Sequence, residues 1–236
     1  MGGDAKAGVA VILEALASIK EDKHKHLPIE VVFTRQEETG LQGAKNLDYT
    51  KLSAKKGFSF DGEGKVSQID LSSVSYTTVD VTIKGRGAHA GLEPEKGISA
   101  IEIASHIISR MRLGRIDSET TANIGLIAGG SVRNAVPDQL QFKGEIRSRN
   151  LKTLANHEKH FREVIAEVLV KYPEAEIELK IEKEIDGYLL DEEHYLISQV
   201  SSIFKKMNLT PIFHHSGGLT DVNIFRNHGI DRKSVV

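Results

Sequence analysis

Two adjacent carboxylates are the strongest local sign of chemistry in the sequence. Glu37 and Glu38 lie in the run Gln36-Glu37-Glu38-Thr39-Gly40, directly after the apolar, β-branched residues 29–34. Neighbouring carboxylates repel each other unless a cation neutralises them. One of the pair can then bind a metal while the other stays free as a general base. A solvated acidic loop is the commoner interpretation of such a dipeptide taken alone.

Two aspartates occupy comparable positions at the ends of predicted elements. Asp4 precedes a predicted helix, where aspartate usually caps the helix, and Asp61 follows a predicted strand, where it usually forms a turn. In α/β sheets, ligands bind beyond the carboxyl ends of the strands. We therefore expect Asp4, Glu38 and Asp61 at one edge of a sheet, where three carboxylates make a divalent-metal site. The sequence contains no cysteine, so metal ligands must be His, Asp or Glu.

A second set of polar residues lies among glycines or beside basic residues. His89 lies in Gly85-Arg86-Gly87-Ala88-His89-Ala90-Gly91, which indicates a loop whose backbone approaches another group closely. Arg133-Asn134 and Arg147 are suited to binding a carboxylate. For each of these residues taken singly, a solvated surface position is the ordinary interpretation.

A glycine loop near the end of the chain is the last candidate. Ser216-Gly217-Gly218-Leu219-Thr220-Asp221 is typical of an anion-binding loop at the start of a helix, without the Gly-Lys-Ser/Thr spacing of a phosphate loop. His214 and His215 precede it and more often end a strand than bind a metal.

The order of predicted helices and strands indicates which elements hold these residues in place. Residues 5–20, 40–47, 192–207 and 220–226 have helical spacing, and residues 29–34 and 57–60 read as buried strands. This alternation predicts an α/β layer with a mainly parallel sheet. From residue 76 the pattern changes to strands at 76–84, 121–127, 140–147 and 176–182 and helices at 98–111 and 154–171. That β-α-β-β-α-β order is ferredoxin-like. We expect it to be an inserted α+β domain, residues 74–186, interrupting a domain formed by residues 1–73 and 187–236.

Composition excludes several classes of function. Of the 236 residues, 39% are hydrophobic and 27% charged, and the net charge is -2, so electrostatics give no reason to expect nucleic acid or membrane as a partner. No apolar run is long enough to span a membrane, and the N-terminus lacks a signal-peptide pattern. We therefore expect a cytoplasmic protein. The two ends suggest a shortened chain, because no strand precedes Asp4 and the residues after Ile230 are too polar for the strand expected there.

Taken together, these motifs resemble the co-catalytic zinc exopeptidases, a family that includes peptidase T, carboxypeptidases and aminoacylases, with the peptidase T type most similar. The matches cover nearly the whole chain in the order of the family. They are Gly3-Asp4-Ala5-Lys6-Ala7-Gly8, Glu37–Lys45, Asp61-Gly62, Gly87–Gly91, Pro94-Glu95-Lys96-Gly97, Asn134-Ala135-Val136-Pro137-Asp138 and Ser216–Asp221. The resemblance implies a phosphorylase/hydrolase-like α/β fold interrupted by a ferredoxin-like lid and dimerisation domain.

The resemblance also implies a role for each matched residue. Asp4 bridges two Zn²⁺ ions (or Co²⁺ or Mn²⁺), Glu38 and Asp61 each bind one of them, and Glu37 is the general base. His89 acts on a substrate in the partner subunit of a homodimer. Asn134 and Arg147, with the glycine loop at Gly217 and Gly218, hold the substrate. Departures are Ala5, where the family usually has Asp, and Gln36, where it usually has Gly. Two further histidine-bearing ligand positions lie outside this sequence.

The expected function is therefore a zinc-dependent exopeptidase, similar to tripeptide aminopeptidases, that hydrolyses short peptides with a metal-activated water. Because two ligands lie outside it, this chain alone is expected to be inactive. The first alternative is an amidohydrolase, deacylase or dipeptidase on the same scaffold. The second is a non-catalytic paralogue that has lost its zinc ions. Flanking sequence with a His-x-Asp motif upstream and a His downstream would favour the enzyme.

Overall fold

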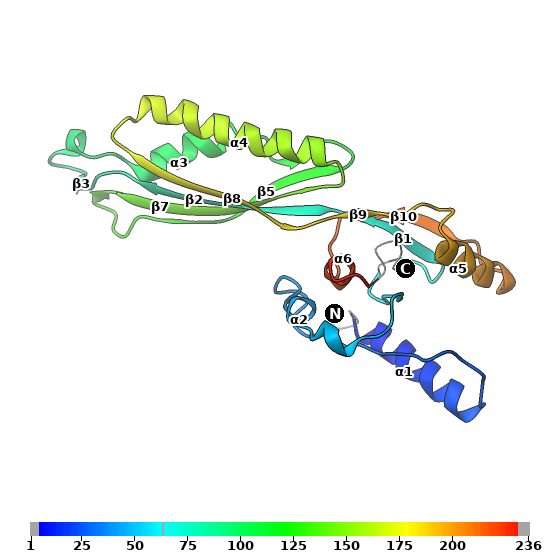
Figure 1. The fold of residues 1–236 in the computed structure, drawn as a ribbon. Helices are drawn as coiled ribbons and strands as arrows, with labels where there is room; N and C mark the ends of the chain where they lie inside the picture. Colours follow the sequence, from blue (N-terminus) through cyan, green and yellow to red (C-terminus); the bar gives the residue numbers. More distant parts are fainter. Residues whose placement is uncertain (1–4, 63, 231–236) are drawn as a thin grey trace. The chain divides into compact units, whose positions relative to one another are not determined.

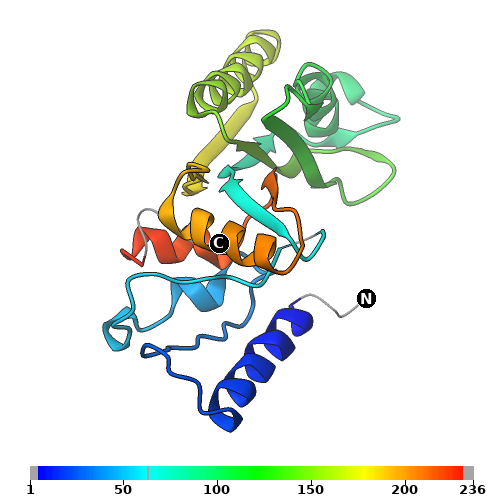
Figure 2. The same cartoon turned by 90° about the vertical axis from the view of Figure 1, so that its right-hand side faces the viewer.

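The computed structural model describes residues 5–62 and 64–230, and the chain forms two compact units. One unit contains residues 1–73 and 188–236, and the other contains residues 74–187, which lie between those two stretches in sequence. Figures 1 and 2 show the ribbon in two views.

The unit formed by residues 74–187 is built on an antiparallel sheet with the strand order β4-β5-β7-β2-β8. Two helices, α3 and α4, cover one face of this sheet (Figure 1). The element order β2-α3-β5-β7-α4-β8 confirms the predicted ferredoxin-like arrangement. The elements are β2 (Ser75–Lys84), β3 (Ala88–His89), η2 (Pro94–Lys96), α3 (Ala100–Ile108), β4 (Gly114–Arg115), β5 (Thr120–Gly129), β6 (Ala135–Val136), β7 (Gln139–Ser148), α4 (Leu151–Lys171) and β8 (Glu176–Ile185).

The period-two pattern of β2 explains why this sheet has one apolar and one polar face. Val79, Val81 and Ile83 are completely buried against the helices, and the residues between them point to the other face. Burial of each such side chain contributes about 1.5–3 kcal/mol. The core continues with Phe142 of β7 and Phe161 of α4, both fully buried. The opposite face carries cross-strand polar pairs, such as the ion pair of Asp80 and Lys143 at 3.2 Å.

The other unit contains a small mixed sheet in which β1 lies between β10 and β9. The pair β1–β10 is parallel and the pair β1–β9 is antiparallel. Its core is formed by Ile69, Leu71, Leu190 and Ile197, all buried. The architecture is thus α/β with an α+β insertion, as predicted. The elements are α1 (Lys6–Glu21), α2 (Gln42–Lys45), η1 (Tyr49–Lys51), β1 (Gln68–Ser73), β9 (Tyr188–Leu189), α5 (Tyr195–Lys206), β10 (Ile212–His215) and α6 (Asp221–Asn227).

Two predicted strands are wrong. Residues 29–34 and 57–60 form no strand, and β1, which was not predicted, is the central strand instead. Phe33 is 50% exposed and Phe60 is 52% exposed. A run of apolar, β-branched residues indicates that a segment tends to be buried. A strand also needs a neighbouring strand to accept and donate its backbone hydrogen bonds. Residues 29–34 have no such pairing among the described residues, and in the second segment only Gly57 makes an isolated β-bridge.

The helix predicted over residues 5–20 forms as α1, but none of its described residues is buried. Its contact with the rest of the unit is made at Gly8, where an added Cβ would lie 2.0 Å from the carbonyl oxygen of Phe60. Only glycine permits this approach of helix to backbone. The contact fixes the first turns of α1 beside the residue that precedes Asp61.

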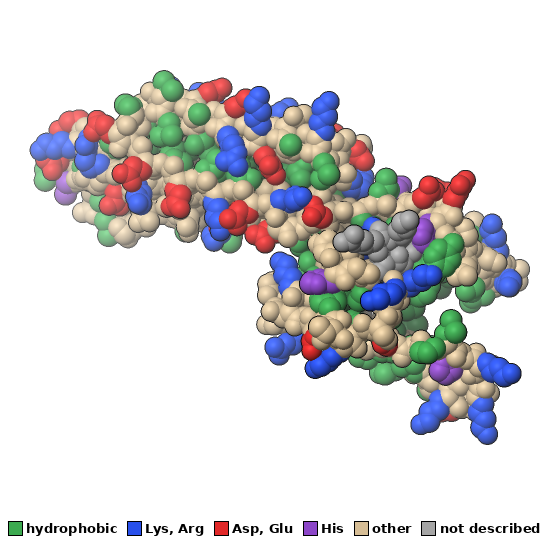
Figure 3. Space-filling model, in the orientation of Figure 1, with side chains coloured by type: hydrophobic (Ala, Val, Ile, Leu, Met, Phe, Trp, Pro, Cys, Tyr) green, Lys and Arg blue, Asp and Glu red, His purple; other side chains and the backbone are tan. Residues whose placement is uncertain are grey.

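The surface of the described residues carries charges of both signs. Figure 3 shows acidic and basic side chains interspersed over the unit of residues 74–187, with no large area of one sign in this view. This mixture agrees with the net charge of -2. Within the described part of the chain, no helix combines the length and apolar character needed to cross a membrane.

Candidate active site

The carboxylates of Glu37 and Glu38 project from a tight turn that leads into α2. The amide groups of Gly40 and Leu41 both donate hydrogen bonds to the carbonyl oxygen of Glu37, at 3.1 and 2.8 Å. The Thr39 hydroxyl donates a hydrogen bond to the Gln36 carbonyl oxygen at 3.1 Å. These bonds fold the backbone back on itself, so that Glu37 is half-buried and Glu38 is exposed.

The backbone of this turn is strained. Gln36 has φ 57° and Leu41 has φ 60°, both in the left-handed region that side chains other than glycine rarely adopt. Each such residue costs on the order of 1 kcal/mol or more. Leu41 is 2% exposed, so its packing helps to hold the turn in place. Strained residues on both sides of a carboxylate pair support a functional role for that pair, because such strain clusters at active sites.

Packing against α2 and α6 keeps the turn in position. An added Cβ at Gly43 of α2 would lie 2.4 Å from the carbonyl oxygen of Arg35, so glycine is required there. On the other side, the Thr34 hydroxyl donates a hydrogen bond to the buried carboxylate of Asp221, the first residue of α6. Burial raises the pKa of Asp221. A pocket of about 340 Å³ lies behind the turn and is lined by residues 33–36, 42, 43 and 46–48.

A stacked ring pair joins η1 to the end of α6. The ring of Tyr49 lies 3.8 Å from that of His228 and is nearly parallel to it. Burial, with a smaller contribution from the Asp221 carboxylate, raises the pKa of Tyr49 to about 12. The tyrosine therefore stays neutral, and its hydroxyl donates a hydrogen bond to the Ala44 carbonyl oxygen at 2.8 Å. Residues 34–49 and α6 thus form one packed block.

The predicted metal ligands are described only in part. Asp61 is half-buried and follows the backbone of Phe60, on which Gly8 of α1 packs. Glu38 is exposed, and Asp4 lies outside the described residues. Among residues 5–62 and 64–230, no group of three or more His, Asp or Glu side chains could by itself hold a metal ion. The donors that are described are carboxylate oxygens, which suit a divalent cation, but they do not complete a site.

His89 and Asn134 are brought together by the short strands β3 and β6. His89 pairs with Ala135, the neighbour of Asn134, and the Ala90 amide donates a hydrogen bond to the Asn134 carbonyl oxygen at 3.0 Å. The Gly91 amide donates a hydrogen bond to Nδ1 of His89 at 3.2 Å. An accepting Nδ1 leaves the proton of a neutral imidazole on Nε2. The exposed His89 ring therefore presents an N–H donor.

Arg147 lies at the other end of β7 from this pair. From Gln139 to Arg147 the strand extends roughly 27 Å, so one copy of this unit does not bring Arg147 together with Asn134. The Arg147 guanidinium binds both carboxylate oxygens of Glu145, at 2.8 and 3.0 Å. It also lies over the ring of Tyr76, with its Cζ atom 5.4 Å from the ring centroid.

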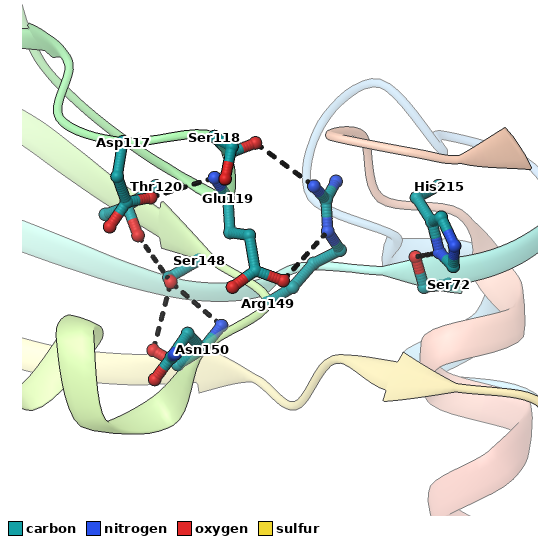
Figure 4. Close-up of polar contacts among 9 residues, drawn as sticks. All are labelled: Ser72, Asp117, Ser118, Glu119, Thr120, Ser148, Arg149, Asn150 and His215. Atoms are coloured by element: carbon teal, nitrogen blue, oxygen red, sulfur yellow. Dashed lines mark hydrogen bonds and ion pairs between the residues drawn. The ribbon is translucent and has the colours of Figure 1, made fainter.

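Two buried serines of β1 hold the glycine loop. The Ser73 hydroxyl lies 2.8 Å from the Gly218 carbonyl oxygen and 3.0 Å from Oδ1 of Asn223, which also accepts a hydrogen bond from the Thr220 amide. Figure 4 shows the neighbouring bond of 2.9 Å between the Ser72 hydroxyl and Nδ1 of His215, which ends β10 as predicted.

The structure gives no reason for a glycine at position 217. It has no positive φ, and an added Cβ would meet no atom within 4 Å. Neither backbone conformation nor packing of the described residues requires glycine at this position.

Sequence reasoning missed the residues that support the candidate site. Thr34, Asp221, Ser73, Asn223 and Glu145 each contact a predicted site residue or its segment through a side-chain hydrogen bond. The signals in the sequence were that Asp221 ends the glycine-loop motif and that Asn223 follows it by two residues.

Two family models match parts of the chain. Residues 72–173 match the peptidase dimerisation domain of the M20 peptidases, and residues 3–61 match the M42 glutamyl aminopeptidases. The first match coincides with most of the unit of residues 74–187, and the second includes the Glu37–Glu38 turn.

Curated relatives match nearly the whole chain. It is 37% identical over 230 residues to the uncharacterised protein YqjE of Bacillus subtilis, covering 98% of this chain and 62% of YqjE. It is 27% identical over 227 residues to peptidase T of Salmonella schwarzengrund, covering 94% of this chain and 54% of that protein. The chain thus spans little more than half the length of these relatives.

Two solved structures share the fold at higher identity than peptidase T of Salmonella. Aminopeptidase PepT of Bacillus cereus aligns with a TM-score of 0.84 and 37% identity, over 97% of this chain and 61% of that chain. A tripeptidase of Staphylococcus aureus aligns with a TM-score of 0.89 and 33% identity, over the same shares. With the dimerisation-domain match and the peptidase T relatives, these alignments support the chain as a peptidase T-like member of the M20 peptidases.

Proposed function

We propose that the protein containing this chain is a metal-dependent aminopeptidase that hydrolyses tripeptides. The observation that carries this proposal is the strained turn that presents Glu37 and Glu38 side by side, because its two left-handed residues indicate a backbone held for function. Its solved relatives include an aminopeptidase and a tripeptidase, which supports the choice of substrate class.

The roles follow from where the carboxylates lie. Asp4, Glu38 and Asp61 would hold divalent cations, with zinc as the first choice and cobalt or manganese as alternatives. A bound metal pair lowers the pKa of a water molecule and polarises the peptide carbonyl. Glu37, next to Glu38 in the same turn, would accept the proton of the attacking water. Its half-buried position is compatible with this role, because part of the side chain is still open to a water molecule.

His89 would donate a hydrogen bond from Nε2 to the oxygen that becomes negative as water attacks. Asn134 lies beside it, whereas Arg147 lies roughly 27 Å away along β7. A tripeptide is only about 10 Å long. The spacing therefore favours a homodimer in which His89 and Asn134 of one subunit and Arg147 of the other serve the same substrate.

Hydrolysis of tripeptides by the full-length, metal-loaded protein tests the proposal. Glu37→Gln should lower kcat by at least about 10²-fold, as expected for loss of a general base, with metal content unchanged. Glu21→Gln, at the exposed end of α1, is the matched control and should retain full activity. Absence of tripeptide cleavage, or preferred cleavage of N-acyl amino acids, would contradict the proposed substrate.

Mixing two inactive variants tests action between subunits. After subunit exchange, His89→Ala and Glu37→Ala should together restore part of the activity, because one site of the heterodimer then has both residues. A mixture that stays inactive despite demonstrated exchange would show that His89 does not act on the partner.

For the 236-residue chain alone, we propose weak zinc binding and no peptidase activity. The ligands that the family resemblance places in it are three carboxylates and no imidazole, and zinc favours sites that include imidazole. Calorimetric titration with zinc measures this directly. Tight binding of two zinc ions by this chain would show that the ligand set is incorrectly assigned.

A further inference from the structure

The guanidinium of Arg147 already binds a carboxylate in this structure. Glu145, two residues earlier in β7, accepts hydrogen bonds from Nε and a terminal nitrogen of Arg147 at 2.8 and 3.0 Å. Residues two apart on a strand point to the same face, here the polar face that α3 and α4 do not cover. This two-point geometry is the one in which arginine binds a peptide's terminal carboxylate.

The Arg147 guanidinium is positioned by Tyr76, its neighbour on the adjacent strand. Tyr76 of β2 is the direct cross-strand partner of Arg147, and its ring lies under the guanidinium. Burial, and then the Glu145 carboxylate, raise the pKa of Tyr76, although the Arg147 charge lowers it. The stacking restricts the guanidinium while leaving the plane of its N–H groups directed at a carboxylate.

The ion pair of Arg147 and Glu145 is partly exposed, so a ligand can reach the Arg147 guanidinium. The side chains of Arg147 and Glu145 are 31% and 29% exposed. A second carboxylate that binds Arg147 by the same two-point contact replaces the hydrogen bonds that Arg147 gives up with Glu145. The exchange therefore carries no large net energetic penalty.

We propose that Glu145 is a resident substitute for the substrate's carboxylate, which must displace it from Arg147 to bind. The inference rests on the proposed function, since it assumes that Arg147 receives the carboxyl end of a peptide. Glu145 acts through Arg147 and is a specificity-determining residue: its competition lowers affinity for peptides with a free terminal carboxylate.

Calorimetric binding of an uncleavable tripeptide analogue, with its first peptide bond reduced, tests this in the full-length, metal-loaded protein. Glu145→Gln should bind the analogue about two- to fivefold more tightly, the range expected from losing a partly exposed competing charge. Binding of the same analogue with an amidated C-terminus should not change. Arg147→Gln should weaken binding of the carboxylate form about tenfold or more and leave the amide form unaffected.

The ion pair of Asp80 and Lys143 on the same polar face provides the matched control. Asp80→Asn removes one negative charge from neighbouring strands without touching Arg147. It should change the affinity of neither analogue. Unchanged affinity in Glu145→Gln, or an equal gain for both analogues or in Asp80→Asn, would overturn the inference. Failure of the wild-type protein to cleave tripeptides would instead contradict the proposed function, which this binding experiment does not require.

Discussion

Gln36 shows at the scale of one residue how a departure from a family pattern is accommodated. The family resemblance implies glycine before the carboxylate pair, and here Gln36 adopts φ 57°, where glycine is unstrained. The structure thus explains both the usual glycine and the strain that its replacement introduces. This could not be read from the sequence, because a backbone angle depends on how the turn is closed by Thr39, Gly40 and Leu41.

Gln36→Gly should therefore leave the turn intact and raise stability. The left-handed backbone costs a non-glycine residue about 1–2 kcal/mol, and the greater freedom of unfolded glycine cancels roughly half of it. We expect a net gain of up to about 1 kcal/mol in urea-induced unfolding. The control Gln42→Gly, at the start of α2, should lose about 1 kcal/mol, since the helical backbone there favours other residues. Equal losses in both variants would contradict the role of the backbone angle.

His157 makes the stability of the unit of residues 74–187 depend on pH. It is 2% exposed, and its Nε2 bonds to the Arg112 carbonyl oxygen at 2.9 Å. Burial lowers the pKa of His157 and, in the same way, that of His160. The unfolded chain then takes up protons near pH 6.5 that the folded chain does not, so stability is present above that pH and is lost as the pH falls through the lowered value.

His157→Gln, which keeps an N–H donor for Arg112, should flatten this dependence below pH 6.5 by up to about 1.4 kcal/mol per pH unit. Urea unfolding of the variant and the wild type between pH 5 and 8 measures the slope. His106→Gln removes an imidazole from a more exposed position on α3 and is the control. If the two variants gave the same slope as the wild type, the burial of His157 would not govern the pH response.

At the scale of elements, the sequence predicted the strands and helices in which apolar residues recur on one face. The strands of the ferredoxin-like unit and helices α2, α5 and α6 were predicted because alternation and helical spacing are local. The segments 29–34 and 57–60 were misassigned because pairing is not local. The same limit hid Ser73 and Asn223, whose contacts join residues 150 apart. The assignment of Glu37 and Glu38 to one metal site stays a prediction.

The start of α4 depends on one capping residue. Oδ1 of Asn150 accepts hydrogen bonds from the amides of Lys152 and Thr153 at 3.0 and 3.1 Å. Figure 4 shows Asn150 connected through the Ser148 hydroxyl to Thr120 of β5. Asn150→Ala should lower the free energy of unfolding by about 1 kcal/mol. Lys152→Ala keeps the capped amide and should change it by less than about 0.5 kcal/mol. Equal effects would show that the cap does not stabilise α4.

At the scale of the whole molecule, the sheet of residues 74–187 has two unlike edges. Beyond its short pairing with β4, β5 has no neighbour on its outer side among the described residues. Leu126 is 66% exposed and Ile127 is 59% exposed on this edge. The segment that matches a peptidase dimerisation domain, residues 72–173, includes this strand, and we propose this edge as the place where two copies meet.

If the proposed homodimer forms at this edge, Leu126→Lys should convert the full-length protein to a monomer. A charge at an apolar edge opposes its pairing with a second strand. Sedimentation measures the change in mass. Val170→Lys replaces a residue of α4 that is 82% exposed and should leave the dimer intact. A dimer that survives Leu126→Lys would place the interface elsewhere.

The opposite edge of the same sheet limits how large an assembly can become. Strand β8 carries Glu176, Glu178, Lys180 and Glu182 at alternate positions along its length. Charged side chains along an edge discourage the addition of further strands. A sheet in which only one edge can pair with another strand joins a single neighbouring sheet. When the same edge of two copies pairs, the copies are related by a two-fold axis. With β5 as the proposed interface, growth would stop at two copies without a partner to cap the sheet.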